Sequence, residues 1–340
     1  MLRRIRCDLQ PFPKVSREML DETMRILTQT GVSCVRYRIQ NNQLSIPQKP
    51  KILCRRFRWI TAALSAICRF APLPTLEFII CLEDSLDAID FPGPVLGFAK
   101  HKSCQNVVLM PDMDALSSHV AKLLYDVRRG IKRYPWSKKK QIAFWRGATT
   151  GAVFSEETFL SLPRTRAVTT SLLLPHLIDA RFTSLVQTQD VQPIQNRYAS
   201  YFSSLSSIKN HLEYKYQLLI DGNTCAYSRA YWQLFSNCVI FKQASDNIQW
   251  FYDLLEPNRH YIPLEADMSD LEEKILWAKE RDREMLAMTE RAQRLAHSCL
   301  KPSSVHYYLY LLLLSIPYQS SSPKDTPRSA YGSLGQRSHG

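Results

Sequence analysis

Short apolar runs alternate with amphipathic segments along most of this chain. Runs that end in polar or turn residues predict buried β-strands; they lie at 75–82, 95–100, 106–111, 141–145, 214–220, 238–243 and 260–264. Apolar residues spaced every three or four positions predict helices; these cover 16–27, 57–70, 114–134, 229–237 and 268–300. Because strands alternate with helices on both sides of Pro135, we expect two α/β domains with parallel sheets.

The two ends of the chain follow different patterns. The stretch SCVRYRIQNNQLSI alternates apolar and polar residues around an Asn-Asn pair and predicts a β-hairpin. The apolar stretch VHYYLYLLLLSIPY is shorter than the roughly 20 residues of a membrane helix. It predicts a helix that packs against the body, with a membrane-surface anchor as the alternative. We place the first domain at 1–136, the second at 137–302, the C-terminal helix at 303–318 and a disordered tail at 319–340.

Composition limits the class of protein and of partner. Hydrophobic residues make up 45% of the 340 positions and charged residues 22%, as in globular proteins. The formal net charge of +13 favours an anionic partner: a nucleotide, a nucleic acid, an acidic glycan or an anionic membrane face. The nine cysteines are odd in number and form no C-x-x-C pair. They predict reduced thiols in a cytosolic protein rather than a disulfide set or a zinc site.

Several common catalytic motifs are absent. The chain contains no G-x-G-x-x-G, no G-x-x-x-x-G-K-[ST] and no H-E-x-x-H. A dinucleotide oxidoreductase, a P-loop enzyme and a zinc protease therefore lose their usual sequence signatures.

Three predicted strands end in polar residues, at the sheet edge where open α/β folds bind ligands. They deliver Glu83, Asp84 and Asp87; then Arg146, Gly147, Thr149 and Thr150; then Asp221, Gly222, Asn223 and, further on, Arg229. Arginines pair well with phosphate oxygens, and glycines let backbone amides approach a phosphate closely. A carboxylate from the other domain is a candidate general base. The alternatives are structural: Asp84 as a helix cap, Arg146 bonded to carbonyls, and Asp221 as a turn residue.

Longer segments resemble glycosyltransferase family 90, which includes lipopolysaccharide-modifying, fungal capsule-associated and animal protein O-glucosyltransferases. The resemblance is carried by FWRGATTG, PRTR, LIDARF, EYKYQLLIDGNTCAYSRAYWQLFSNCVIFKQ and WFYDLLEPNRHYIPLEADMSDLEEKILWAKERD. It is strongest over 141–300, and LFSNCVIFKQ is similar to the bacterial branch. Over 75–136 it is looser, with EFIICLED, VLGFAK, VLMPD and YPWSKKK in order.

The resemblance implies a GT-B architecture, with two Rossmann-like domains that face each other across a cleft. It implies a nucleotide-sugar donor, usually a UDP-sugar, held by the second domain without a metal ion or other cofactor. The family's catalytic aspartate falls on Asp84, followed here by Ser85 and Leu86 instead of an aromatic residue and proline. This difference leaves Glu83 and Asp87 as substitutes.

The donor site implied by the resemblance lies in the second domain. The residues are Arg146, Gly147, Ala148, Thr149, Thr150, Arg164 (with Arg166 as competitor), Gly222, Asn223, Thr224, Cys225, Ala226, Tyr227, Ser228 and Arg229. The loop that ends at Arg229 is one residue longer than in the animal enzymes, so the register of Arg229 stays open.

We therefore expect an inverting glycosyltransferase in which Asp84 takes a proton from the acceptor hydroxyl. The expected acceptor is a glycan, with lipopolysaccharide core as the first candidate. The N-terminus lacks the apolar core of a secretory signal, which favours a cytoplasmic enzyme at the inner membrane, with Lys138–Lys140 as a basic face. The alternatives are a catalytically degenerate glycan-binding member and a basic nucleic-acid-binding protein. No RNA-binding or recognition-helix motif supports the latter, so we expect no nucleic-acid partner.

Overall fold

The first domain is built around a five-stranded mixed sheet. The computed structural model describes residues 2–48, 54–86 and 89–319. The strand order is β2-β1-β3-β4-β6. The strands are β1 (Cys34–Gln40), β2 (Gln43–Gln48), β3 (Leu76–Cys81), β4 (Val95–Gly97) and β6 (Val107–Leu109). The predicted hairpin is confirmed as β1–β2, and its turn residues Asn41 and Asn42 have φ of 51° and 61°, as a two-residue turn requires.

The first sheet is mixed, because the predicted hairpin adds antiparallel strands to the predicted parallel ones. The hairpin strand β1 pairs antiparallel with β3, whereas β3, β4 and β6 run parallel. A tight hairpin forces its own two strands, β1 and β2, to run in opposite directions, so a sheet that contains it cannot be wholly parallel. Helices α1 (Leu2–Leu9), α2 (Arg17–Gln29) and α3 (Arg55–Phe70) pack on this sheet, and α4 (Met113–Leu116) packs on α3.

The second domain contains a five-stranded parallel sheet, as predicted. Its order is β12-β10-β9-β7-β8. The strands are β7 (Lys140–Ala148), β8 (Ile178–Ser184), β9 (Tyr214–Leu219), β10 (Val239–Gln243) and β12 (Ile262–Leu264). The chain fills one side of β7 first and then continues on the other side from β9. From β7 and from β9 the chain therefore continues toward opposite edges of the sheet, and such a switch point is where open α/β sheets bind ligands.

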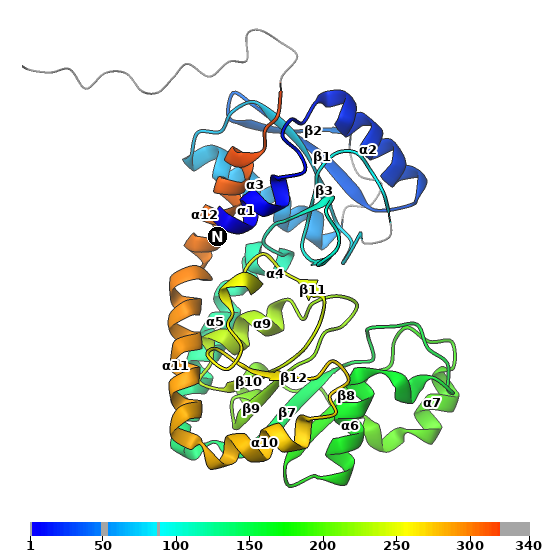
Figure 1. Ribbon diagram of the computed structural model, residues 1–340, viewed down its shortest axis with the longest axis vertical. Coiled ribbons are helices and arrows are strands. Elements are labelled where there is room, and N and C mark those ends of the chain that lie inside the picture. Colours follow the sequence, from blue (N-terminus) through cyan, green and yellow to red (C-terminus); the bar gives the residue numbers. More distant parts are fainter. Residues whose placement is uncertain (1, 49–53, 87–88, 320–340) are drawn as a thin grey trace, which may run out of the picture.

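Helices surround the second sheet and connect it to the first domain. They are α5 (His119–Arg133), α6 (Pro163–Leu173), α7 (Val191–Arg197), α8 (Ile208–His211), α9 (Ser228–Phe235), α10 (Leu271–Glu280), α11 (Asp282–Cys299) and α12 (Pro302–Ser315), with 3₁₀ turns at Trp136–Lys138, Phe159–Ser161, Ala199–Tyr201 and Tyr252–Leu254. Figure 1 shows the two domains stacked, with α11 along one side of the second domain and α12 returning to the first. A small ribbon of β5 (Lys100–His101) and β11 (Asn247–Ile248) also joins them.

The C-terminal helix packs on the body, as predicted. Helix α12 contacts α1, α3 and α4, and the Tyr308 hydroxyl donates a hydrogen bond of 3.1 Å to the Leu109 carbonyl. The predicted disordered tail lies outside the described residues, apart from Gln319. Within the described ranges, none of the helices is long and apolar enough to cross a membrane.

Helix α9 belongs to the second domain but packs into the hydrophobic core of the first. Tyr231, Trp232 and Leu234 lie in one continuous cluster with Ile80 and Tyr308. A separate cluster fills the second domain around its own sheet. The first residues of α9 are therefore held at the boundary between the domains, next to the loop after β3.

Candidate functional site

The loops after β7 and β9 touch at the switch point of the second sheet. The Gly151 amide donates a hydrogen bond of 3.2 Å to Asn223 Oδ1. Gly222 lies so close to the other loop that an added Cβ would be 2.7 Å from Thr150 Oγ1. Glycine at position 222 leaves room for the Thr150 hydroxyl and the Arg164 guanidinium, and the two loops form one surface.

A cavity of about 310 Å³ lies between this surface and the first domain. Its lining residues are Arg56, Asp84, Asp114, Gly147, Ala148, Thr150, Arg164, Gly222, Asn223, Cys225, Ala226, Tyr227, Ser228 and Arg229. The first three belong to the first domain and the others to the second. The cavity therefore forms the cleft that the sequence predicted.

Arg164, on α6, is buried at the floor of the cavity. Its Nε donates to the Asp221 carbonyl at 2.8 Å, and its Nη1 donates to the Ala148 carbonyl at 2.8 Å and to Thr150 Oγ1 at 2.6 Å. Burial lowers the pKa of Arg164 to about 10, against the opposing attraction of the Asp221 carboxylate. The guanidinium is thus held rigidly by carbonyls and a hydroxyl, and its positive charge is only partly compensated.

Arg229, in the first turn of α9, supplies a second cation beside Arg164. Its Nη2 donates to the Arg146 carbonyl, and its Nη1 is buried without a hydrogen-bond partner among the described residues. Burial and the nearby charge of Arg164 lower the pKa of Arg229 to about 9. A buried guanidinium nitrogen without a partner is costly, so an anion in this cavity would be stabilised. Both guanidinium groups also lie over the Trp145 ring, at 5.4 and 5.8 Å.

Arg146 does not contribute its side chain to the cavity, contrary to the prediction that it binds phosphate. Its Nη2 forms an ion pair of 2.8 Å with Asp179 on β8, and its guanidinium covers the Phe144 ring. The reason is strand alternation, because neighbouring residues of β7 face opposite sides of the sheet. What Arg146 contributes to the site is its carbonyl, which accepts the bond from Arg229.

Two other predicted donor-site residues are also turned away from the cavity. Thr149 is buried, and its Oγ1 donates to the Val186 carbonyl and accepts from the Val186 amide. Thr224 is buried, and its hydroxyl bonds to the Tyr227 hydroxyl at 2.6 Å. Both residues shape loops instead of lining the cavity. Arg166 is exposed and paired with Asp267, so of the two competing arginines Arg164 faces the cleft.

The remaining residues of the donor loop reach the cavity. Gly222, Asn223 and the segment 225–229 line it, and α9 begins at Ser228 with its N-terminus toward the cavity. Tyr227 precedes the helix with a φ of 38°, an uncommon conformation for a non-glycine residue. The positive end of the helix dipole adds to the two guanidinium groups.

Asp84 faces the two arginines from the first domain. It lies just beyond β3, where Arg56 donates to its Oδ1 at 2.7 Å and Asn223 donates to its Oδ2 at 3.3 Å. The Tyr227 hydroxyl donates to its backbone carbonyl at 3.0 Å. Of the two proposed substitutes, Glu83 is exposed and absent from the lining, and Asp87 lies outside the described residues.

Arg56 and Asp114 are cavity residues that the sequence interpretation missed. Arg56 belongs to the run CRRFRW, which places three arginines in the first turns of α3. Cations are unfavourable at a helix N-terminus because they oppose the dipole, so this run carried a signal of a nearby anion. Asp114 had no comparable signal.

The expected basic face at Lys138–Lys140 is only partly present. Lys139 is buried and donates to the Leu212 carbonyl, and Lys140 pairs with Glu213 at 2.7 Å. The cause is that β7 begins here, so alternate side chains turn inward.

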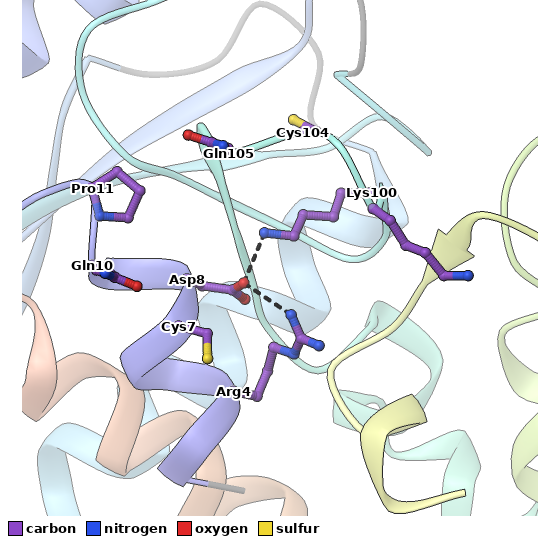
Figure 2. A pocket seen from close by; sticks show the side chains of 9 residues that line it. Arg4, Cys7, Asp8, Gln10, Pro11, Lys100, Cys104 and Gln105 are labelled. Atoms are coloured by element: carbon purple, nitrogen blue, oxygen red, sulfur yellow. Dashed lines mark hydrogen bonds and ion pairs between the residues drawn. The ribbon is translucent and has the colours of Figure 1, made fainter. Parts of the chain in front are cut away.

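A larger cavity, of about 490 Å³, lies between α1 and the β5 region (Figure 2). The buried Asp8 carboxylate accepts from Lys100 at 2.7 Å and from Arg4 at 3.3 Å. Arg4 also pairs with Asp253, and the exposed Lys102 pairs with Asp246. These cations are already matched by carboxylates, so this cavity attracts an anion less than the cleft does.

Neither a metal cluster nor a disulfide is found in the part of the chain that the structure describes. No group of three or more His, Cys, Asp or Glu side chains there is arranged to hold a metal ion. All nine cysteines lie in that part, and each is a free thiol.

Comparisons with known proteins agree on one family. The model of the family described as "Glycosyl transferase family 90" matches residues 1–321. Protein O-glucosyltransferase 3 of Homo sapiens is 27% identical over 332 residues, which are 93% of this chain and 61% of that protein. Protein O-glucosyltransferase 2 of Danio rerio is 30% identical over 289 residues, covering 82% and 54%. The chain thus spans about half to three fifths of these relatives.

Among solved structures, Anabaena HepE in complex with UDP and glucose is similar with a TM-score of 0.43 and 9% identity. The match covers 77% of this chain and 76% of that one. TarM is similar with a TM-score of 0.37 and 11% identity, over 54% and 37%. The family model matches nearly the whole described chain, whose two α/β domains face each other across the cleft, and the chain therefore belongs to glycosyltransferase family 90.

Proposed function

We propose that the cleft binds the diphosphate of a nucleotide sugar, with a UDP-sugar as the donor. The observation that carries this is the pair Arg164 and Arg229, which both line the cavity, together with Arg229 Nη1, which is buried without a hydrogen-bond partner among the described residues. A diphosphate would supply the missing acceptor oxygens and the counter-charge. The N-terminus of α9 would add backbone donors. In this proposal these groups, rather than a metal ion, carry the charge of the leaving group.

We propose that Asp84 acts as general base in an inverting transfer. The acceptor oxygen attacks the anomeric carbon, the bond from that carbon to the diphosphate oxygen breaks, and the acceptor proton passes to Asp84. The diphosphate leaves with the bonding electron pair, and Arg164 and Arg229 stabilise its growing charge. The position of Asp84 on the first-domain wall of the same cavity supports this role.

For the acceptor we propose a hydroxyl of a polypeptide. The relatives carry the name protein O-glucosyltransferase, which favours this acceptor and glucose as the sugar. The glycan acceptor expected from the sequence, with lipopolysaccharide core as its candidate, is the alternative.

A thermal-shift screen against UDP, GDP, CMP and their sugars tests the donor. UDP or a UDP-sugar should raise Tm selectively, because ligands that bind only the folded state stabilise it. If no nucleoside diphosphate raises Tm, the donor site is refuted. A transfer assay with UDP-glucose then compares a serine-containing protein extract with a lipopolysaccharide fraction, and NMR of the product reports whether the anomeric configuration is inverted.

A further inference from the structure

The Asp84 carboxylate is held by a different donor on each of its two oxygens. On the first-domain side, Arg56 bridges two acceptors at the end of β3. Its Nη1 donates to the Leu82 carbonyl at 2.6 Å, and its Nη2 donates to Asp84 Oδ1 at 2.7 Å. A planar guanidinium that bonds both groups fixes the carboxylate relative to the strand end.

The second oxygen has a weaker partner from the other domain. Asn223 Nδ2 donates to Asp84 Oδ2 at 3.3 Å, and this contact is exposed. The other end of the amide is well held, because Asn223 Oδ1 accepts from Gln187 Nε2 at 2.8 Å and from the Gly151 amide at 3.2 Å. An ion-paired bond of 2.7 Å from a guanidinium is stronger than a bond of 3.3 Å from a neutral amide, so Oδ2 is the oxygen that can exchange its partner.

We propose that Arg56 is the positioning residue for the general base, leaving Asp84 Oδ2 to accept the proton. This rests on the proposed function of Asp84. When the acceptor binds, its hydroxyl replaces the Asn223 amide on Oδ2, while Arg56 stays on Oδ1. The proton then moves from the acceptor oxygen to Oδ2 as the new glycosidic bond forms. Arg56 also lines the cavity, and in this arrangement it acts on the reaction through Asp84.

The test compares Arg56→Met and Arg56→Lys with the control Arg58→Met, which changes an exposed arginine on the same helix. A misplaced base costs about 10²-fold in rate. We expect Arg56→Met to lower kcat by about 10- to 100-fold while Kd for UDP stays near the wild-type value. Arg56→Lys should recover part of the loss because it retains a cationic donor, and Arg58→Met should match wild type.

Two outcomes would overturn the proposal. One is a wild-type kcat in Arg56→Met; the other is a parallel loss of UDP affinity and kcat in both Arg56 variants, which indicates a structural role only. If Arg56→Met does not fold, Arg56→Lys decides by whether its kcat falls at constant Kd. Asp84→Asn separates the proposed general base from its proposed positioning. If Asp84→Asn is active, both proposals are refuted. If Asp84→Asn is inactive while Arg56→Met is fully active, the positioning role of Arg56 alone is refuted.

Discussion

Asp84 and Asn223, 139 positions apart in the sequence, are joined by a hydrogen bond of 3.3 Å across the cleft. Asp84 follows β3, the central strand of the first sheet, and Asn223 follows β9, the central strand of the second. The carboxylate is therefore held in place by both domains at once. A site that needs both walls is complete only when the domains are in contact, which helix α9 secures by packing into the first-domain core.

Exchanging Arg164 for methionine should weaken UDP binding by about 10- to 100-fold, since hydrogen bonds to charged groups contribute about 1.5–3 kcal/mol. Isothermal titration measures the loss. Arg166→Met is the matched control, because Arg166 lies two residues away on the same helix but is exposed and paired with Asp267. Equal losses in the two variants would contradict the assignment of Arg164.

A methyl group at position 222 should disturb the cavity floor. The Cβ of Gly222→Ala would lie 2.7 Å from Thr150 Oγ1 and 3.0 Å from Arg164 Nη2. Overpacking of this kind costs about 1–3 kcal/mol of stability. We expect a lower Tm and weaker UDP binding. Adding Thr150→Ala removes the nearer clash and should restore part of the Tm; no recovery would show that the contact with Thr150 is not the cause.

Acid should destabilise the fold through His211. Burial, with the charge of Arg229, lowers the pKa of His211 from 6.5 to about 3. Between these values the unfolded chain binds a proton that the folded chain does not. Stability therefore falls as the pH drops below 6.5, by about 1.4 kcal/mol per pH unit. Denaturant unfolding of wild type and His211→Gln from pH 7 to pH 5 measures this contribution.

The difference between wild type and variant is the relevant quantity, because Asp112 acts in the opposite direction. Burial raises the pKa of Asp112 to about 7, so the folded state binds the extra proton in the same pH range. Removal of His211 should leave a profile that is flatter or reversed on the acid side. Identical pH slopes in the two proteins would contradict the role of His211.

Neutralising Asp84 should remove transfer without removing the donor. General-base help contributes about 10²–10⁴ in rate, so Asp84→Asn should lose activity by at least that range. UDP binding should persist because Arg164 and Arg229 are unchanged. Product formation and Tm with UDP are measured on the same sample; wild-type turnover would exclude Asp84 from the reaction.

Much of the fold followed from apolar periodicity. The parallel second sheet, the Asn-Asn hairpin and the packed C-terminal helix were predicted because each depends on local pattern. The antiparallel pairing of β1 with β3 was not, since periodicity shows which residues are buried but not which strands are neighbours.

The residues of the site also divide into those that were predicted and those that were not. Asp84, Arg164, Gly222 and Arg229 were predicted and meet in one cavity. Arg146 turns away because side chains alternate along β7, and Thr149 turns away because its hydroxyl bonds the Val186 backbone; a motif records neither. Arg56 lies on a helix outside the recognised motifs and Asp114 lies two residues beyond VLMPD, and tertiary packing brings both to the cleft.

The most direct test of the account is a crystal structure of the chain with UDP bound. We expect the diphosphate to lie between Arg164 and Arg229, with an oxygen on Arg229 Nη1 and its outer end toward Asp84. UDP bound elsewhere, for example in the cavity beside Arg4 and Lys100, with the cleft arginines unchanged, would contradict the account.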